Sequence, residues 1–230
     1  MTDILVNSEK LAKQYKIGEV VVNALGGIDF KIETGAFTAF VGPSGSGKST
    51  LLNIIGCLDK PTTGKILVLE TDVSGLNRRK AAAFRGENIG FIFQDFNLIP
   101  VLSAAENIEY PLIMVQKWPA GRRRRRVSEL LEAVDLSAQA DNRPDQLSGG
   151  QKQRVAVARA LAAGPRMVLA DEPTANLDSE TAGRIISLMR SIRDSFGTTF
   201  IFSTHDKRIV DKAEQVFFME DGLLRQEGAA

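Results

Sequence analysis

The segment GPSGSGKST, residues 42–50, limits what this chain can fold into more than any other stretch of it. It fits the pattern Gly-x4-Gly-Lys-Ser/Thr, whose glycines let successive backbone N–H groups converge on an anion at the start of a helix. The apolar run at residues 37–41 suits a buried strand, and the leucines and isoleucines at 51–55 suit a core-facing helix that ends at Gly56. A strand, a loop and a helix in this order are the setting of a phosphate-binding loop.

The residue types of this loop predict a nucleotide site that includes a magnesium ion. Lys48 can reach the β- and γ-phosphates, and the Ser49 hydroxyl can ligate Mg²⁺. The residues expected around the phosphates are Gly42, Pro43, Ser44, Gly45, Ser46, Gly47, Lys48, Ser49 and Thr50. The alternative is a Gly- and Ser-rich turn between two core elements. The loop by itself does not distinguish a kinase, a GTPase switch and a motor.

Length and composition exclude several classes of protein. A chain of 230 residues makes one large domain or two closely joined lobes. Its 29 basic and 28 acidic residues nearly cancel, so we expect no nucleic-acid partner. No apolar stretch approaches the roughly 18 to 20 residues that cross a bilayer, and the start MTDILVNSEK lacks the features of a signal peptide. A cytoplasmic location is therefore expected. The single cysteine, Cys57, is expected to be a small buried residue.

Apolar runs separated by turn residues predict the other strands. We expect a small, mostly antiparallel sheet over residues 4–32, in runs broken by Gly18, Gly26 and Gly27. Further strands are expected at residues 62–69, 89–93, 167–170 and 199–202, and a hairpin with an Asp-Gly turn at residues 216–224.

Helices are indicated by caps and by apolar positions at helical spacing. Ser103 and Glu106 fit a capping box that opens a short helix, which should stop before Pro111. Three more helices are expected: one around residues 127–134, one at 152–163, and one at 182–196 that ends at Gly197. The second of the four helices is preceded by five consecutive arginines, residues 122–126. They fit a solvated helix start or a contact with an acidic partner or lipid headgroups.

Polar side chains follow three of the predicted strands. Gln94 comes after the strand at 89–93, Asp171 and Glu172 follow the strand at 167–170, and His205, the chain's one histidine, follows the strand at 199–202. The carboxyl ends of strands face the crevice where α/β sheets bind ligands. Asp171 suits a metal-bound phosphate site and Glu172 suits the attacking water. The alternatives are a solvated strand end for the acids and an ordinary surface residue for His205.

Two further features have a functional and a structural interpretation. Ser148, Gly149 and Gly150 precede an Ala-rich helix, where they can form a second anion-binding N-terminus or an ordinary N-cap. Tyr15 lies in the polar segment KQYKIGE, where it can stack on a purine or pack against the protein.

Several motifs occur in one order along the chain: GPSGSGKST, Gln94, LSGGQ (147–151), MVLADE (167–172), the segment 176–178 and His205. This order resembles the nucleotide-binding subunit of an ATP-binding cassette (ABC) transporter, over essentially the whole chain. The resemblance implies an α/β fold, a P-loop NTPase core with an N-terminal antiparallel β-subdomain and an inserted helical subdomain. It implies one domain, residues 1–230, with the core at 1–94 and 164–230 and the helical signature subdomain at 95–163.

The resemblance also implies roles for residues around the bound ATP. Tyr15 would stack on adenine, and Gln94 would ligate Mg²⁺ and water and sense the membrane partner. Asp171 would support Mg²⁺, Glu172 would be the general base, and His205 would stabilise the γ-phosphate in the transition state.

A second set of residues would act across a dimer. In this family two chains meet head to tail and enclose two ATP molecules. Ser148, Gly149, Gly150 and Gln151 would then hold the γ-phosphate of ATP bound to the second copy, and Asp178 would bridge the two copies.

The remaining partners implied by the resemblance are membrane proteins. Permease subunits would dock between Gln94 and Pro111, where the loop is unusually apolar, and would hold the chain at the cytoplasmic face of the cell membrane. The segments FQDFNLIPVLSAAENIEYPL and IGEVVVNAL are similar to the lipoprotein-releasing and macrolide-exporting group, which implies ATP-driven export or release of a lipoprotein, peptide or macrolide-like substrate and a periplasmic adaptor. An amino-acid importer ATPase and a soluble ABC ATPase acting on nucleic acid are the alternatives, and LSGGQ disfavours a phosphate-loop kinase.

Overall fold

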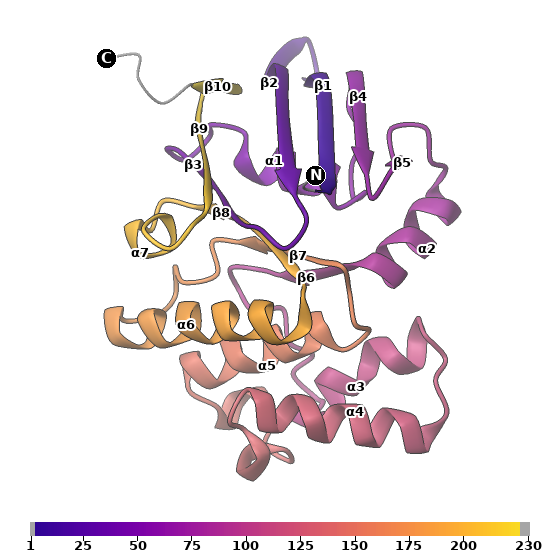
Figure 1. Ribbon diagram of the computed structural model, residues 1–230, viewed down its shortest axis with the longest axis vertical. Helices are drawn as coiled ribbons and strands as arrows, with labels where there is room; N and C mark the ends of the chain where they lie inside the picture. Colours follow the sequence, from indigo (N-terminus) through magenta and orange to yellow (C-terminus); the bar gives the residue numbers. More distant parts are fainter. Residues whose placement is uncertain (1–2, 226–230) are drawn as a thin grey trace. The chain divides into compact units, whose positions relative to one another are not determined.

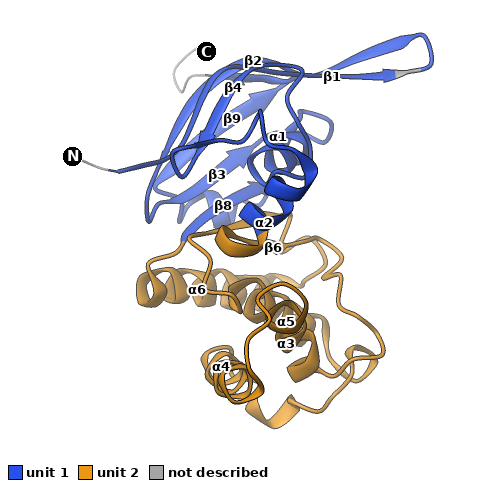
Figure 2. Ribbon diagram, turned by 90° about the vertical axis from the view of Figure 1, so that its right-hand side faces the viewer, with its two compact units in different colours: residues 1–85, 199–230 blue, residues 86–198 orange. Residues whose placement is uncertain are grey.

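A computed structural model describes residues 3–225 of the chain. The chain forms two compact units (Figure 2): unit 1 comprises residues 1–85 and 199–230, and unit 2 comprises residues 86–198. The predicted helical subdomain, residues 95–163, lies wholly within unit 2, and its boundaries stay a prediction. Within residues 3–225, no helix combines the length and the apolar character that crossing a membrane requires.

Unit 1 contains the predicted antiparallel sheet, in the strand order β2-β1-β4-β5 (Figure 1). Its strands are β1 (Ile4–Ile17), β2 (Val20–Glu33), β4 (Thr63–Val68) and β5 (Thr71–Asp72). The prediction that glycines break the first strands is wrong for Gly26 and Gly27, which lie inside β2. The pairing of β1 with β2 shifts register there instead, since Leu11 pairs with Ile28 but Ala12 pairs with Gly26. A β-bulge absorbs the extra residue and the strand continues.

A second group of strands in unit 1 runs in the order β10-β9-β3-β8. These strands are β3 (Phe37–Val41), β8 (Thr199–Thr204), β9 (Gln215–Glu220) and β10 (Leu223–Arg225), accompanied by helices α1 (Lys48–Ile55) and α7 (Lys207–Val210). β3 is parallel to both β8 and β9, whereas β10 folds back on β9 as the predicted hairpin. Fully buried phenylalanines from β3 and β8 pack on the faces of this sheet, and the ring centroids of Phe37 and Phe202 lie 4.4 Å apart.

Unit 2 is mainly helical and contains one parallel pair of strands, β6 (Ile89–Ile92) and β7 (Met167–Asp171). Its helices are α3 (Ala104–Met114), α4 (Ala120–Ala133), η1 (Ser137–Gln139), η2 (Pro144–Gln146), α5 (Gly149–Leu161) and α6 (Ser179–Phe196). α5 contacts α3, α4 and α6, so it forms the centre of the unit. Its buried side chains are mostly valine and alanine, which allow these helices to pack closely.

Several helices differ from the sequence prediction; α4, for example, begins at Ala120, seven residues before the expected start at residue 127. α3 does not stop before Pro111 but continues to Met114, and the Pro111 carbonyl accepts from Val115 N beyond the proline. α5 begins at Gly149, three residues before the predicted start. α2 (Arg78–Asn88) was not expected, since Ala81 is its only buried residue and it therefore has no apolar stripe.

Candidate active site

The loop between β3 and α1 has the backbone that its glycines predict. Gly47 is the N-cap of α1 with φ 100°, and Gly45 has φ 83°. A Cβ atom on Gly47 would lie 2.4 Å from the Ala24 carbonyl oxygen, so β2 leaves no room for a side chain there. Glycine is thus required by both conformation and space. The backbone N–H groups of the loop lie at the N-terminus of a helix, which is the arrangement that binds phosphate.

Lys48 is held inside this loop. Its side chain is buried, and Nζ donates to the carbonyl oxygens of Gly42 at 2.7 Å and Pro43 at 2.9 Å. A buried ammonium needs such partners, because desolvating a charge without them is costly. The positive charge is therefore fixed at the loop that would receive the phosphates. Ser49, on the first turn of α1, is exposed.

His205 follows the strand next to the phosphate loop. Val41, the last residue of β3, pairs with Thr204, the last residue of β8, in parallel register. The loop that starts at Gly42 and the exposed His205 therefore leave the same edge of the sheet. This placement agrees with the sequence prediction, while the catalytic role of His205 stays a prediction.

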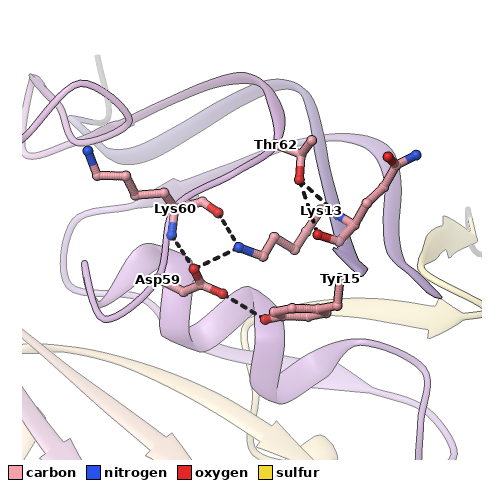
Figure 3. A network of polar contacts seen from close by, with 6 residues as sticks. Lys13, Tyr15, Asp59, Lys60 and Thr62 are labelled. Carbon is pink, nitrogen blue, oxygen red and sulfur yellow. Dashed lines mark hydrogen bonds and ion pairs between the residues drawn. The ribbon is translucent and has the colours of Figure 1, made fainter. Parts of the chain in front are cut away.

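Tyr15 lies on β1 in unit 1, and its hydroxyl donates to Asp59 Oδ2 at 2.7 Å (Figure 3). Asp59 also accepts from Lys13 Nζ at 2.7 Å. Sequence reasoning identified Tyr15 but missed Asp59 and Lys13. Nothing in a local pattern links residues 13 and 59, which antiparallel pairing of β1 with β4 brings together.

Gln94, Asp171 and Glu172 lie at one edge of the strand pair in unit 2. Ile92 at the end of β6 pairs with Ala170 near the end of β7, so Gln94 after β6, Asp171 at the end of β7 and Glu172 after it lie at the same end of the strand pair. Glu172 has φ 45°, and its carbonyl accepts from Ala175 N at 3.2 Å in the turn that follows. A glutamate in the left-handed region is strained, and such strain is found most often at functional sites.

Two side chains to which the sequence prediction gave no role organise the loop after Gln94. Asn176 Nδ2 donates to the Gln94 carbonyl at 2.9 Å. Arg159 on α5 donates to the carbonyls of Phe96, at 2.7 Å, and Asn97, two consecutive residues with positive φ. Burial lowers the pKa of the Arg159 guanidinium, but arginine stays charged in proteins. The conformation of the Gln94 loop is therefore tied to α5 and to the segment after β7.

The LSGGQ segment forms the start of α5. Ser148 and Gln151 make a capping box: Ser148 Oγ accepts from Gln151 N at 3.3 Å, and Ser148 N donates to Gln151 Oε1 at 2.9 Å. The N-cap interpretation is thus confirmed, and it leaves the first N–H groups of the helix for an anion. Gly150 lies against α6, because a Cβ atom there would be 2.5 Å from Thr181 Cγ2.

Beside this helix start is a cavity of about 580 Å³. Its lining includes Ser148, Gly150 and Gln151 together with Arg154 and Arg184. Asp178, the predicted bridge between copies, is the N-cap of α6, and its carboxylate accepts from Thr181 N at 2.9 Å. The side-chain hydrogen bond from Thr181 and further hydrogen bonds from the backbone lower the pKa of Asp178, so it is ionised at neutral pH.

The five arginines at residues 122–126 lie in the first two turns of α4 and have different surroundings. Arg123 Nε donates to Glu109 on α3 at 2.7 Å, and Arg126 donates to the Leu161 carbonyl at the end of α5 at 3.0 Å. The side chain of Arg125 is 85% exposed. The run is therefore only partly a solvated helix start, because two of its members hold α4 to neighbouring helices. A contact with an acidic partner or lipid stays a prediction.

The predicted metal ligands Ser49, Gln94 and Asp171 all offer oxygen atoms. Within residues 3–225 no group of three or more His, Cys, Asp or Glu side chains could hold a metal ion by itself. This donor set suits Mg²⁺, which takes few protein ligands and fills its coordination with water and nucleotide phosphate. It does not suit zinc, which prefers His and Cys ligands.

Comparison with known proteins gives consistent results. Residues 25–175 match the family model of ABC transporters. The chain is 44% identical over 94% of its length to the lipoprotein-releasing system ATP-binding protein LolD of Anaeromyxobacter dehalogenans, of which the match covers 90%. It is 45% identical over 96% of its length to the macrolide export ATP-binding/permease protein MacB of Brucella melitensis, of which it covers 34%.

A solved structure extends the agreement to the fold. The ATP-binding cassette of Methanocaldococcus jannaschii, dimeric in a post-hydrolysis state with ADP and Pi, has a TM-score of 0.88 and is 42% identical, with 96% of this chain and 97% of that chain covered. The fold predicted from the sequence, an ABC ATPase cassette, is thereby confirmed. On the family match, this identity and the motifs above, the chain belongs to the ABC transporter family, as one of its ATPase cassettes.

Proposed function

We propose that this chain is the ATP-binding and ATP-hydrolysing subunit of a bacterial ABC transporter that exports or releases its substrate, a lipoprotein, peptide or macrolide-like molecule, through separate membrane subunits. The observation that carries this proposal is the presence of two anion-binding helix starts in one chain: the phosphate loop before α1 and the LSGGQ capping box before α5. The names of the relatives LolD and MacB support export rather than import.

Each set of residues has a task that its chemistry supports. Lys48 and the loop N–H groups bind the β- and γ-phosphates, and Tyr15 stacks on adenine. Ser49, Gln94 and Asp171 would hold Mg²⁺, which would supply positive charge to offset the negative charge of the phosphates. Glu172 accepts the proton of the attacking water, and His205 donates a hydrogen bond to the γ-phosphate.

Two copies of the chain would close around ATP. The dimeric state of the M. jannaschii cassette with ADP and Pi supports a symmetric pair. In such a pair Ser148, Gly149, Gly150 and Gln151 face the γ-phosphate of the partner's ATP, and the cavity beside them gives the partner nucleotide room. Hydrolysis removes the shared γ-phosphate, and the copies separate because those contacts are lost.

The membrane subunits would dock on an apolar surface of unit 2. Val101 is 70% exposed, and Tyr110, Ile113, Met114 and Val115 are exposed on and just after α3. Several exposed large apolar side chains in one stretch of the sequence support an interaction site there. We propose that the docking region, predicted between Gln94 and Pro111, extends to Val115, because exposed apolar side chains continue to that residue. Docking there would hold the chain at the cytoplasmic face of the membrane, with a periplasmic adaptor across it.

The central test compares the wild type with Glu172→Gln. Loss of a general base costs about 10²- to 10⁴-fold in rate while ATP binding is kept. We expect the variant to bind ATP, to hydrolyse it slowly, and to accumulate as an ATP-bound dimer, measured by phosphate release and light scattering. Glu132→Gln, on the exposed face of α4, is the matched control and should behave as the wild type. A Glu172→Gln chain that hydrolyses ATP normally and stays monomeric would contradict the mechanism.

Docking is tested separately with Val101→Glu. The substitution places a charge on the apolar surface, so stimulation of ATP hydrolysis by the co-purified membrane subunits should disappear while ATP binding stays unchanged. Loss of ATP binding as well would show that Val101 supports the fold rather than a partner.

A further inference from the structure

The hydroxyl of Tyr15 is anchored by a carboxylate (Figure 3). It donates to Asp59 Oδ2 at 2.7 Å. Asp59 lies three residues beyond Gly56, the C-cap of α1, which is the helix that begins at the phosphate loop. The hydroxyl therefore links β1 to the segment that follows this helix.

Asp59 is itself held in place by several contacts. Its Oδ1 accepts from Lys13 Nζ and from Lys60 N, each at 2.7 Å, and its own N–H donates to the Asn53 carbonyl at 3.2 Å. Burial raises the pKa of Asp59, but hydrogen bonds from Lys13, Tyr15 and the Lys60 N–H together with the Lys13 charge outweigh burial, so the pKa is lowered. An ionised carboxylate only accepts hydrogen bonds, so the Tyr15 hydroxyl must donate to it.

One face of the Tyr15 ring is covered by Lys13. Residues 13 and 15 are two apart on β1, so their side chains point to the same face of the strand. The Lys13 ammonium lies 4.7 Å from the ring centroid and donates also to the Lys60 carbonyl at 2.7 Å. The Lys13 side chain is only 11% exposed, so it is fixed rather than sampling solvent. A ring held by its hydroxyl and by one face can stack on a ligand only through its other face.

We propose that Asp59 is a positioning residue for the purine of the bound nucleoside triphosphate. By holding the Tyr15 hydroxyl, it fixes the ring relative to the phosphate loop before the nucleotide arrives. The groups that contact adenine and the phosphates are then both in position before ATP binds, so binding does not have to order the tyrosine side chain. This inference rests on the proposed function, which places Tyr15 against adenine.

The test measures the affinity for two probes, ATP and inorganic tripolyphosphate, each with Mg²⁺. Asp59→Ala releases the ring, so we expect the affinity for ATP to fall about 3- to 10-fold, the cost of ordering one side chain on binding. The affinity for tripolyphosphate should stay unchanged, because that probe has no base. In turnover the KM for ATP should rise and kcat should not. Asp59→Asn keeps one acceptor for the Tyr15 hydroxyl and should restore part of the affinity for ATP.

A double-mutant cycle shows whether Asp59 acts through Tyr15. Tyr15→Phe removes the anchored hydroxyl and keeps the ring, so it should weaken ATP binding about as much as Asp59→Ala. Adding Asp59→Ala to Tyr15→Phe should cause no further loss, because the two residues act through one contact. Asp72→Ala is the matched control: Asp72 is paired with Lys65 at 4.0 Å in the same sheet and has no link to Tyr15.

Two results would overturn the inference. One is an equal loss of affinity for ATP and tripolyphosphate in Asp59→Ala, which indicates a general support of the phosphate loop. The other is an undiminished effect of Asp59→Ala in the Tyr15→Phe background. Tyr15→Leu separates this inference from the proposed function: if it leaves ATP affinity unchanged, Tyr15 is not the adenine contact. If it weakens ATP binding while Asp59→Ala does not, only the role of Asp59 fails.

Discussion

At the scale of single residues, several predicted functional side chains also have a structural task. Ser148 and Asp178 cap α5 and α6, and Lys48 donates to carbonyls of its own loop. A cap presents a polar group at the start of a helix, where unpaired N–H groups attract anions. A serine or an aspartate can therefore both accept a hydrogen bond from the first N–H groups of a helix and line a phosphate site. For this reason a motif pattern alone does not separate the two interpretations.

The roles of residues in local motifs could be predicted from the sequence, but contacts between residues far apart in the chain could not. The glycines of the phosphate loop were predictable because positive φ demands glycine. Asp59 and Arg159 were not, because each acts on residues more than forty positions away in the chain. The positive φ of Glu172 could not be predicted either, because nothing in the sequence indicates a strained backbone at a glutamate.

Cys57 gives a prediction at the residue scale. Burial raises the pKa of its thiol to about 11, although the charge of Arg85 acts in the opposite direction. The folded chain therefore holds the proton more tightly than the unfolded chain. Stability from this group is present below the unfolded pKa, near 9, and is lost as pH rises through the folded value of about 11. At pH 8 the folded protein should react slowly with Ellman's reagent and the unfolded protein rapidly.

The control is Cys57→Ala, which should remove this part of the pH dependence of unfolding. Rapid, complete labelling of the folded wild type at pH 8 would show that the thiol is accessible and not raised in pKa.

At the scale of elements, Asn107 explains the conformation of the segment before α3. It is completely buried. Its side chain accepts from Ile99 N at 2.8 Å and donates to the carbonyls of Ile99, Leu102 and Ser103. This one amide thus replaces the partners that a strand or helix would supply. It fixes a loop that Phe96, Leu98 and Ile99 make apolar.

Asn107→Leu should accordingly destabilise the protein. The substitution leaves the Ile99 N–H group and the Leu102 carbonyl without the partner that Asn107 supplied, which costs about 2 to 4 kcal/mol in the free energy of unfolding. Gln153→Leu on α5 is the contrast, because within residues 3–225 its equally buried amide makes no hydrogen bond. It should cost little or stabilise. Urea unfolding of both variants measures this difference, and equal losses would contradict the role given to Asn107.

Local signals account for which elements the sequence predicts well. The Ser103–Glu106 capping box and the Gly197 cap of α6 were predicted, because each depends on residues within one helical turn. The continuation of α3 through Pro111 was not. Ile108 and Leu112 on either side of the proline are fully buried, and this burial offsets the lost hydrogen bond.

At the scale of the whole molecule, the motifs are divided between the two units. The phosphate loop, Tyr15 and His205 belong to unit 1, and Gln94, LSGGQ, Asp171, Glu172 and Asp178 belong to unit 2. The family could be predicted from the order of these motifs, because that order is read directly from the sequence and does not depend on the fold.

The proposed pairing of two copies leads to a complementation test. Lys48→Ala removes the phosphate-loop charge, and Gly149→Asp places a carboxylate where LSGGQ would meet the partner's γ-phosphate. Gly149 tolerates a side chain, because a Cβ atom there would make only an ordinary contact, 3.5 Å from Leu177 Cδ2. An aspartate in the first turn of α5 is also favourable for the helix. Each variant alone should fold and should not hydrolyse ATP.

In a head-to-tail dimer, the mixture of the two variants should regain activity. A mixed pair has one site with an intact phosphate loop from the Gly149→Asp chain and an intact LSGGQ from the Lys48→Ala chain. If half of the dimers are mixed and their sites act independently, phosphate release should reach about a quarter of the wild-type rate. A chain carrying both substitutions, mixed with either single variant, should regain nothing. If differently tagged chains co-purify with ATP and the first mixture stays inactive, each site is complete within one chain and the paired arrangement is wrong.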